Sequence, residues 1–181
     1  VADPAALLEI AARESVDLTV VGPELPLSLG IVDLFRAEGR AIVGPSRAAA
    51  ALESSKAFAK AFMERHRIPT SRFRVCDSAE AAFAAIASGE FGYPVVLKAD
   101  GLAAGKGVVI AEDHAAAEGA VRTTMVDRRF GVAGERLVLE EFLVGEEASY
   151  FVLADGTACL PLSSAQDHKR IFDGDRGANT G

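Results

Sequence analysis

The residues best suited to bind an anion lie at the end of a predicted strand and in the loop behind it. The strand covers residues 94–98, is apolar, and ends at Lys98. The loop that follows contains three glycines and a second lysine: Gly101, Gly105, Gly107 and Lys106. Glycine lets backbone N–H groups turn toward an anion without obstruction by a Cβ, and two ammonium groups would neutralise a polyphosphate. The pattern predicts a phosphate-binding flap between two strands, although a surface hairpin with solvated lysines shares it.

A P-loop does not fit the same residues. Gly101 and Gly105 are one residue closer together than the P-loop spacing requires, and Gly107 stands where a Ser or Thr should follow the lysine. The element that follows also has the pattern of a strand, predicted over residues 107–111, whereas a P-loop is followed by a helix. The P-loop is therefore excluded.

A second segment joins an apolar strand to paired carboxylates. The strand is predicted over residues 137–142, and the acidic residues and glycine near its end are Glu140, Glu141, Gly145, Glu146 and Glu147. Backbone N–H and C=O groups of such a strand-to-linker segment can bind a purine, with Phe142 or Leu143 packed on the ring. Glu147 lies just past the turn, where it can accept hydrogen bonds from ribose hydroxyls. The alternative is an acidic, solvated hairpin.

The first 45 residues alternate predicted helices with short apolar strands. Helices are predicted to about residue 15 and over residues 28–38, and strands over residues 18–21 and 41–43. Short apolar strands separated by helices indicate a parallel sheet covered on both faces, here part of a Rossmann-like α/β layer. Glu24 follows the first strand, at the carboxyl edge where such sheets bind ligands. A turn carboxylate near a helix start is the other interpretation.

The rest of the chain has an α+β pattern, and we place the boundary near residues 46–55. The expected domains are residues 1–50, the end of the Rossmann-like domain, and residues 51–181. Helices are predicted over residues 46–66 with a break near Ser54, from Asp77 with Glu80 as a capping box, and from Asp113. Further strands are predicted over residues 72–76, and a hairpin over residues 147–154 and 157–162 turns at Asp155 and Gly156.

Composition narrows the class of protein. The 181 residues carry 19 Lys and Arg against 26 Asp and Glu, and the resulting net charge of −7 argues against a nucleic-acid-binding surface. Half of the residues are hydrophobic, but no apolar run approaches the roughly 18 residues of a membrane span, and no signal peptide is recognisable. Cys76 and Cys159 lie in apolar stretches, so both are expected to be buried and reduced in a cytoplasmic protein. Val1 and Gly181 do not look like natural ends, so we expect a fragment lacking both ends.

Together, in this order and spacing, the two segments resemble the nucleotide site of ATP-grasp enzymes. The resemblance is more specific to the phosphoribosylamine–glycine ligase family of de novo purine biosynthesis, also called glycinamide ribonucleotide synthetases. The stretches that carry it are GPELPL at residues 22–27, SKAF at 55–58, KADGLAAGKGV at 98–108, EEFLVGEEAS at 140–149 and QDHKR at 166–170. They span nearly the whole chain, so the resemblance implies that residues 51–181 form the first part of an ATP-grasp domain.

The resemblance also implies roles at the ATP site. The ATP-binding residues are then Lys56, Lys98, Gly101, Gly105, Lys106, Gly107, Glu140, Glu141, Phe142, Leu143 and Glu147. The lysines would contact the phosphates under the glycine flap, and Glu140 would face the adenine amino group. Glu141 and Leu143 would offer backbone groups to the ring, and Glu147 would bind the ribose.

The implied reaction joins glycine to 5-phosphoribosylamine. ATP phosphorylates the glycine carboxylate to glycyl phosphate, and attack by the amine gives glycinamide ribonucleotide, ADP and phosphate. The substrate-binding residues are then Glu24, Asp167, Lys169 and Arg170. The resemblance implies Mg²⁺, with Mn²⁺ as an alternative, held by a Glu and an Asn downstream of this chain, so no metal ligand is assigned and the fragment alone is expected to be inactive. Another ATP-grasp carboxylate–amine ligase or a non-catalytic nucleotide-binding module remains an alternative.

Overall fold

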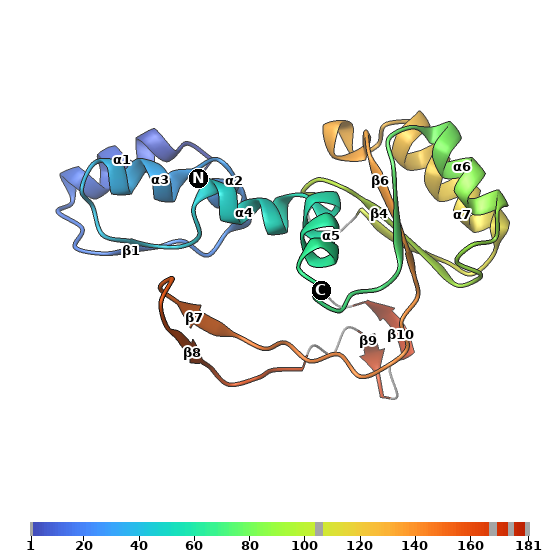
Figure 1. Ribbon diagram of the computed structural model, residues 1–181. Coiled ribbons are helices and arrows are strands. Elements are labelled where there is room, and N and C mark those ends of the chain that lie inside the picture. Colours follow the sequence, from blue (N-terminus) through green and yellow to red (C-terminus); the bar gives the residue numbers. More distant parts are fainter. Residues whose placement is uncertain (1, 104–106, 167–169, 174–175, 180–181) are drawn as a thin grey trace. The chain divides into compact units, whose positions relative to one another are not determined.

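The computed structural model describes residues 2–103, 107–166, 170–173 and 176–179, and the chain divides into two units (Figure 1). The first unit comprises residues 1–142 and the second residues 143–181. Among the described residues, no helix has the length and apolar character needed to cross a membrane.

The N-terminal part of the first unit contains a small parallel sheet and three helices. The elements are α1 (Pro4–Arg13), β1 (Thr19–Val20), α2 (Glu24–Ser28), α3 (Ile31–Ala37) and β2 (Ile42–Val43), with β1 and β2 parallel as predicted. Asp3 caps α1 by accepting hydrogen bonds from the N–H groups of Ala5 and Ala6. A buried apolar cluster joins these elements: Ala11, Ile31, Val32, Phe35 and Ile42.

The helix predicted over residues 28–38 is confirmed as α3, which starts at Ile31 because Gly30, with a left-handed φ of +86°, precedes it. The five-residue helix α2 was not predicted. One prediction about this part is wrong: the strands are not covered on both faces within the described residues, since Val20 is 70% exposed and Val43 is 45% exposed. These strands are therefore more apolar than their burial in this unit accounts for.

The rest of the first unit is built on a four-stranded antiparallel sheet in the order β3-β6-β4-β5. The elements are α4 (Arg47–Ser54), α5 (Lys56–Arg65), β3 (Phe73–Cys76), α6 (Ala79–Ala87), β4 (Val95–Ala99), β5 (Val108–Ala111), α7 (His114–Val121), the π-helix η1 (Arg122–Val126), the 3₁₀-helix η2 (Gly131–Gly134) and β6 (Leu137–Glu141). The break predicted near Ser54 is confirmed, because Ser55 caps α5 by accepting from the N–H of Phe58.

The two faces of this sheet differ in chemistry. Successive side chains of a strand point to opposite faces. Leu97 of β4 and Leu139 of β6 are fully buried in the apolar core with α6 and α7, and burial of each leucine contributes about 1.5–3 kcal/mol. Lys98 and Glu140 therefore belong to the other face, the side of the sheet on which Figure 1 shows α5. The sheet thus separates an apolar core from a face that carries charged side chains.

Two smaller expectations also need correction. Ser78, and not Asp77, caps α6, because the Ser78 Oγ accepts from the N–H of Ala81 while Asp77 pairs with Arg136. Asp77 therefore forms no capping box with Glu80. Cys76 is buried as expected, but Cys159 is exposed in the second unit.

The described residues of the second unit form two antiparallel strand pairs. They are β7 (Val152–Ala154) with β8 (Cys159–Pro161), and β9 (Arg170–Phe172) with β10 (Arg176–Asn179). The predicted turn is confirmed: Gly156 has a φ of +97°, and the Asp155 carboxylate accepts from the N–H groups of Thr157 and Ala158. These hydrogen bonds lower the pKa of Asp155 to about 2. The arms are shorter than predicted.

Candidate functional site

The predicted flap is built on two adjacent antiparallel strands. Lys98 of β4 stands opposite Val108 of β5, and the N–H of Ala99 donates to the carbonyl oxygen of Gly107 at 2.7 Å. The loop between the strands therefore leaves and returns at the same end of the sheet, next to Lys98. Gly105 and Lys106 lie outside the described residues.

Glu140 of β6 is the acidic centre of the charged sheet face. It stands opposite Val96, two positions along from the pair of Lys98 and Val138, so Lys98 lies diagonally across from it on the same face. The Lys98 Nζ donates to the Glu140 Oε2 at 3.1 Å, and the Ser71 Oγ donates to the same oxygen at 2.7 Å. Glu140 is only 5% exposed. The side chain predicted to face an adenine amino group is thus held by donors of the protein.

A third donor, Lys60 of α5, was not predicted from the sequence. Its Nζ lies 2.9 Å from the Glu140 Oε2, in an ion pair whose two side chains are 7% and 6% exposed. Ala57 lies three positions before Lys60 and shares its helix face, and both residues are buried in the structure. The sequence gives no signal for this burial, because a lysine on a helix is usually solvated.

The surroundings of Glu140 fix its charge. Burial by itself would raise the pKa of this carboxyl, but hydrogen bonds from Lys60 and Ser71, with the charge and hydrogen bond of Lys98, outweigh burial. The pKa of Glu140 therefore lies below its ordinary value. The group is an ionised carboxylate at neutral pH and can only accept hydrogen bonds.

Lys56 is joined to the start of the flap by Asp100. The backbone N–H of Lys56 donates to the carbonyl oxygen of Asp100 at 3.1 Å, and the Lys56 Nζ donates to that of Gly101 at 3.1 Å. The Asp100 carboxylate accepts from the N–H of Ala57 at 2.7 Å and from the Ser55 hydroxyl at 3.1 Å. Burial lowers the pKa of Lys56, while the charge of Asp100 opposes that shift. The structure thus brings two predicted phosphate-binding residues, Lys56 and Gly101, into contact.

Replacing Asp100 with alanine should destabilise the complete protein that contains this chain by about 1–2 kcal/mol, because it removes the acceptor at the start of α5. The free energy of unfolding in urea measures the effect. Asp77→Ala is the matched control, since its ion pair with Arg136 is exposed and should contribute about 0–1 kcal/mol. Equal losses in the two variants would show that Asp100 does not anchor the helix.

The flap glycines at positions 101 and 107 allow close packing. A Cβ on Gly101 would lie 2.8 Å from the Cβ of Ala133, and one on Gly107 would lie 2.8 Å from the Cβ of Ala103. The N–H of Gly101 donates to the carbonyl oxygen of Ala133 at 3.3 Å. At Gly101 the structure therefore shows a close approach to η2, where the sequence suggested a donor turned toward an anion.

The predicted adenine linker spans the end of one unit and the start of the next. The Glu141 carboxylate accepts from the N–H and Nε of Arg72, and the N–H of Glu141 donates to the Arg72 carbonyl oxygen. The backbone N–H of Glu141 is thus already used inside the protein. Phe142 is exposed and ends the first unit, whereas Leu143 and Glu147 are exposed residues of the second.

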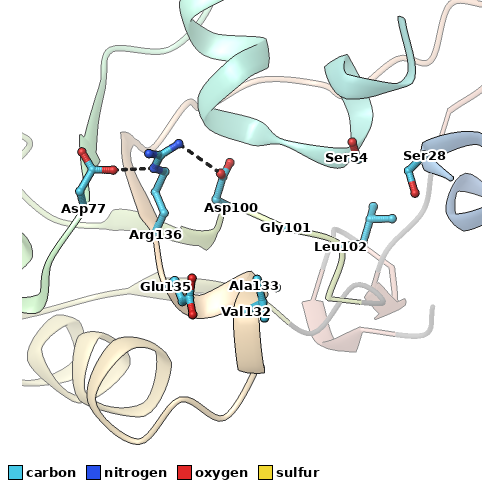
Figure 2. Close-up of a pocket in the computed structure, with 10 residues that line it drawn as sticks. All are labelled: Ser28, Ser54, Asp77, Asp100, Gly101, Leu102, Val132, Ala133, Glu135 and Arg136. Carbon is cyan, nitrogen blue, oxygen red and sulfur yellow. Dashed lines mark hydrogen bonds and ion pairs between the residues drawn. The ribbon is translucent and has the colours of Figure 1, made fainter. Parts of the chain in front are cut away.

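A cavity of about 810 Å³ in the first unit lies beside the start of the flap. Figure 2 shows Arg136 on its wall between Asp77 and Asp100. The Arg136 Nε lies 2.6 Å from Asp77 Oδ1, and its Nη1 lies 3.9 Å from Asp100 Oδ2. Gly101 also lines the cavity, but Lys98 and Glu140 do not. The charged sheet face and this cavity are therefore separate features that share the start of the flap.

The predicted substrate residues are less defined. Glu24 is exposed and begins α2 soon after β1, as expected for a residue at the carboxyl edge of the parallel strands. Arg170 begins β9 in the second unit. Asp167 and Lys169 lie outside the described residues. Within the described part of the chain, no three His, Cys, Asp or Glu side chains are grouped as metal ligands.

Comparisons with known proteins agree on one family. The family model described as phosphoribosylglycinamide synthetase, N domain, matches residues 1–53, and the one for its ATP-grasp (A) domain matches residues 54–181. The phosphoribosylamine–glycine ligase of Ralstonia nicotianae is 55% identical over 100% of this chain and 42% of its own length. The chain thus spans less than half of the length of this curated relative.

Solved structures agree. The phosphoribosylamine–glycine ligase of Thermotoga maritima has a TM-score of 0.72 and 36% identity, covering 91% of this chain and 39% of its own. Biotin carboxylase from Campylobacter jejuni, solved as a β,γ-ATP complex, has a TM-score of 0.78 at 21% identity, covering 94% and 39%. The predicted fold class, the end of a Rossmann-like layer followed by the start of an ATP-grasp domain, is confirmed. The chain belongs to the phosphoribosylglycinamide synthetase family.

Proposed function

We propose that the complete protein containing this chain ligates glycine to 5-phosphoribosylamine at the expense of ATP. The products are glycinamide ribonucleotide, ADP and phosphate, formed through glycyl phosphate, in de novo purine biosynthesis. The observation that carries the proposal is the charged sheet face at the base of the β4–β5 flap, where Lys98 and Glu140 lie side by side. Membership of the family supports the choice of substrates.

The ATP phosphates are assigned to Lys56 and Lys98. Lys98 is 29% exposed, and among the described residues its Nζ donates only to Glu140, which leaves two N–H groups for phosphate oxygens. Lys56 stands at the first turn of α5, against the start of the flap. Phosphoryl transfer to a carboxylate brings two anions together, so cations at this position lower the barrier by neutralising charge. Gly101, Gly105, Lys106 and Gly107 remain the proposed flap.

The base and ribose are assigned to the segment after β6. The Glu140 Oε2 is occupied by three donors, so Oε1 is the oxygen proposed to accept from the adenine amino group. Glu141, Phe142 and Leu143 are proposed to border the ring, and Glu147 the ribose. These assignments rest on the resemblance, together with the ionised state of Glu140.

The other substrates and the metal are assigned more coarsely. Glu24 is proposed to bind the ribose of 5-phosphoribosylamine, and Asp167, Lys169 and Arg170 the anionic parts of the substrates. The division into residues 1–50 and 51–181 remains part of the proposal. Mg²⁺, when bound, would supply further charge neutralisation at the phosphates. Because the described residues offer no grouped ligands, no step is assigned to a metal held by them.

The test is ADP formation by the complete protein with 5-phosphoribosylamine present and glycine added or withheld. We expect ADP release to require glycine and to be accompanied by equimolar glycinamide ribonucleotide. ATP turnover that ignores glycine but needs another carboxylate would identify a different ATP-grasp ligase. ATP binding without turnover for any carboxylate would support a non-catalytic nucleotide-binding module.

A further inference from the structure

Lys60 has no N–H group left for a ligand. Its ammonium carries three N–H donors, and four oxygens surround them. The Nζ donates to Thr70 Oγ1 at 2.8 Å, to Ser71 Oγ at 2.6 Å and to the Ser71 carbonyl at 3.4 Å, and it lies 2.9 Å from Glu140 Oε2. The side chain is 7% exposed. Lys60 therefore acts on any bound molecule only through its neighbours.

Those neighbours form a cluster with an unbalanced charge. We call Lys60, Ser71, Lys98 and Glu140 the Glu140 cluster. Both ammonium groups approach the same oxygen, Glu140 Oε2, at 2.9 and 3.1 Å. Two cations share one anion, so the cluster carries a net charge of +1. The lysine that faces outward is Lys98, which is 29% exposed.

Sharing the carboxylate changes what Lys98 can offer. With Lys60 present, the Glu140 charge is already compensated, so Lys98 retains its attraction for another anion. Without Lys60, Glu140 and Lys98 would be a one-to-one ion pair of zero net charge in a partly desolvated position. Coulomb attraction is stronger there than in water, so the carboxylate would hold the ammonium against transfer to a phosphate.

We propose that Lys60 is a positioning residue that compensates Glu140 and thereby leaves the Lys98 ammonium available to the ATP phosphates. The inference rests on the proposed function, because it takes ATP as the ligand of Lys98. It goes further by assigning control of phosphate affinity to a buried residue that touches no substrate. It also explains why a lysine with saturated donors is buried beside a second lysine.

The test compares ATP and adenosine affinities of the complete protein by titration calorimetry. Lys60→Met should weaken ATP binding about tenfold, equivalent to about 1.4 kcal/mol, and leave adenosine binding unchanged. Lys60→Met with Glu140→Gln returns the cluster charge to +1. Because Glu140 is also the proposed acceptor for the adenine amino group, recovery is judged by the ratio of ATP affinity to adenosine affinity, which should return close to that of the native protein. Arg65→Met, which removes an exposed cation from the same helix, is the matched control and should change neither affinity.

Each outcome decides between the alternatives. A recovered ratio of ATP affinity to adenosine affinity in the double variant supports charge compensation, whereas a ratio as low as that of Lys60→Met shows that Lys60 is only structural and overturns the inference. Equal losses of ATP and adenosine overturn it as well. If Lys60→Met does not fold, which circular dichroism reports, the double variant alone decides. If the native protein binds no ATP, the proposed function is refuted instead. If the native protein shows glycine-dependent turnover and Lys60→Met is equally active, only the inference is refuted.

Discussion

Replacing Lys98 with methionine should lower the affinity of the complete protein for ATP by roughly 10- to 150-fold. The removed contact is a hydrogen bond between two charged groups, which contributes about 1.5–3 kcal/mol. The fold should persist, because Glu140 keeps its ion pair with Lys60 at 2.9 Å and its hydrogen bond from Ser71. The loss should therefore appear in binding and not in the free energy of unfolding. Titration calorimetry with ATP and with adenosine measures it.

The control for this variant is Arg74→Met. Arg74 also lies on the sheet, in β3. Its ion pair with Glu90 is exposed, and neither residue belongs to the Glu140 cluster. Its removal should leave ATP affinity unchanged. Adenosine has no phosphates, so its affinity should be equal in the native protein and in Lys98→Met. An unaltered ATP affinity in Lys98→Met would remove the main support for the proposed phosphate site.

The elements of the ATP-grasp part could be predicted because each carries a local signal. Ser55 and Asp113 begin helices at positions where their side chains accept from backbone N–H groups. The strands β4 and β6 are short apolar runs, and both were placed within one or two residues. Such signals depend on neighbours in the sequence and need no tertiary contact.

The wrong predictions concern helix capping and burial at positions where tertiary contacts determine the structure. Ser78 and Asp77 are both good helix caps, and the ion pair of Asp77 with Arg136, 59 residues away, could not be read from the sequence. Cys159 lies in an apolar stretch, but it is exposed in the second unit. For the same reason, the apolar strands of the small parallel sheet suggested more cover than the described residues provide.

The candidate site shows the same division. Lys98 and Glu140 could be selected because each ends an apolar strand, and antiparallel pairing of the two strands then brings them together. Lys60 could not be selected in that way, because a lysine on a helix is usually solvated. Its burial depends on the packing of α5 against a sheet face that already carries a carboxylate. The sequence thus predicted two members of the Glu140 cluster, and the structure supplied the other two.

Replacing Glu140 with alanine should destabilise the complete protein by about 3–5 kcal/mol, the usual cost of leaving a buried charge without its partner. Lys60 would keep Thr70 and Ser71 as acceptors but would lose its counter-charge. Lys98 is 29% exposed and can turn its ammonium toward water, so the cost arises mainly at Lys60. Urea unfolding at pH 7 measures the loss. Glu141→Ala is the control, since its ion pair with the exposed Arg72 should contribute only about 0–1 kcal/mol.

Two further measurements identify the buried ion pair as the cause. The folded-state pKa of Glu140 lies below the unfolded value of about 4.3, so its stabilisation is complete above that pH and is lost as the pH falls through the folded pKa. The difference between the native protein and Glu140→Ala should therefore shrink below about pH 4. Lys60→Met with Glu140→Ala, which leaves the same space at position 140 but removes the unpaired ammonium, should be more stable than Glu140→Ala alone. A pH-independent difference, or a double variant no more stable than the single one, would show that the loss comes from a cavity and not from the unpaired lysine.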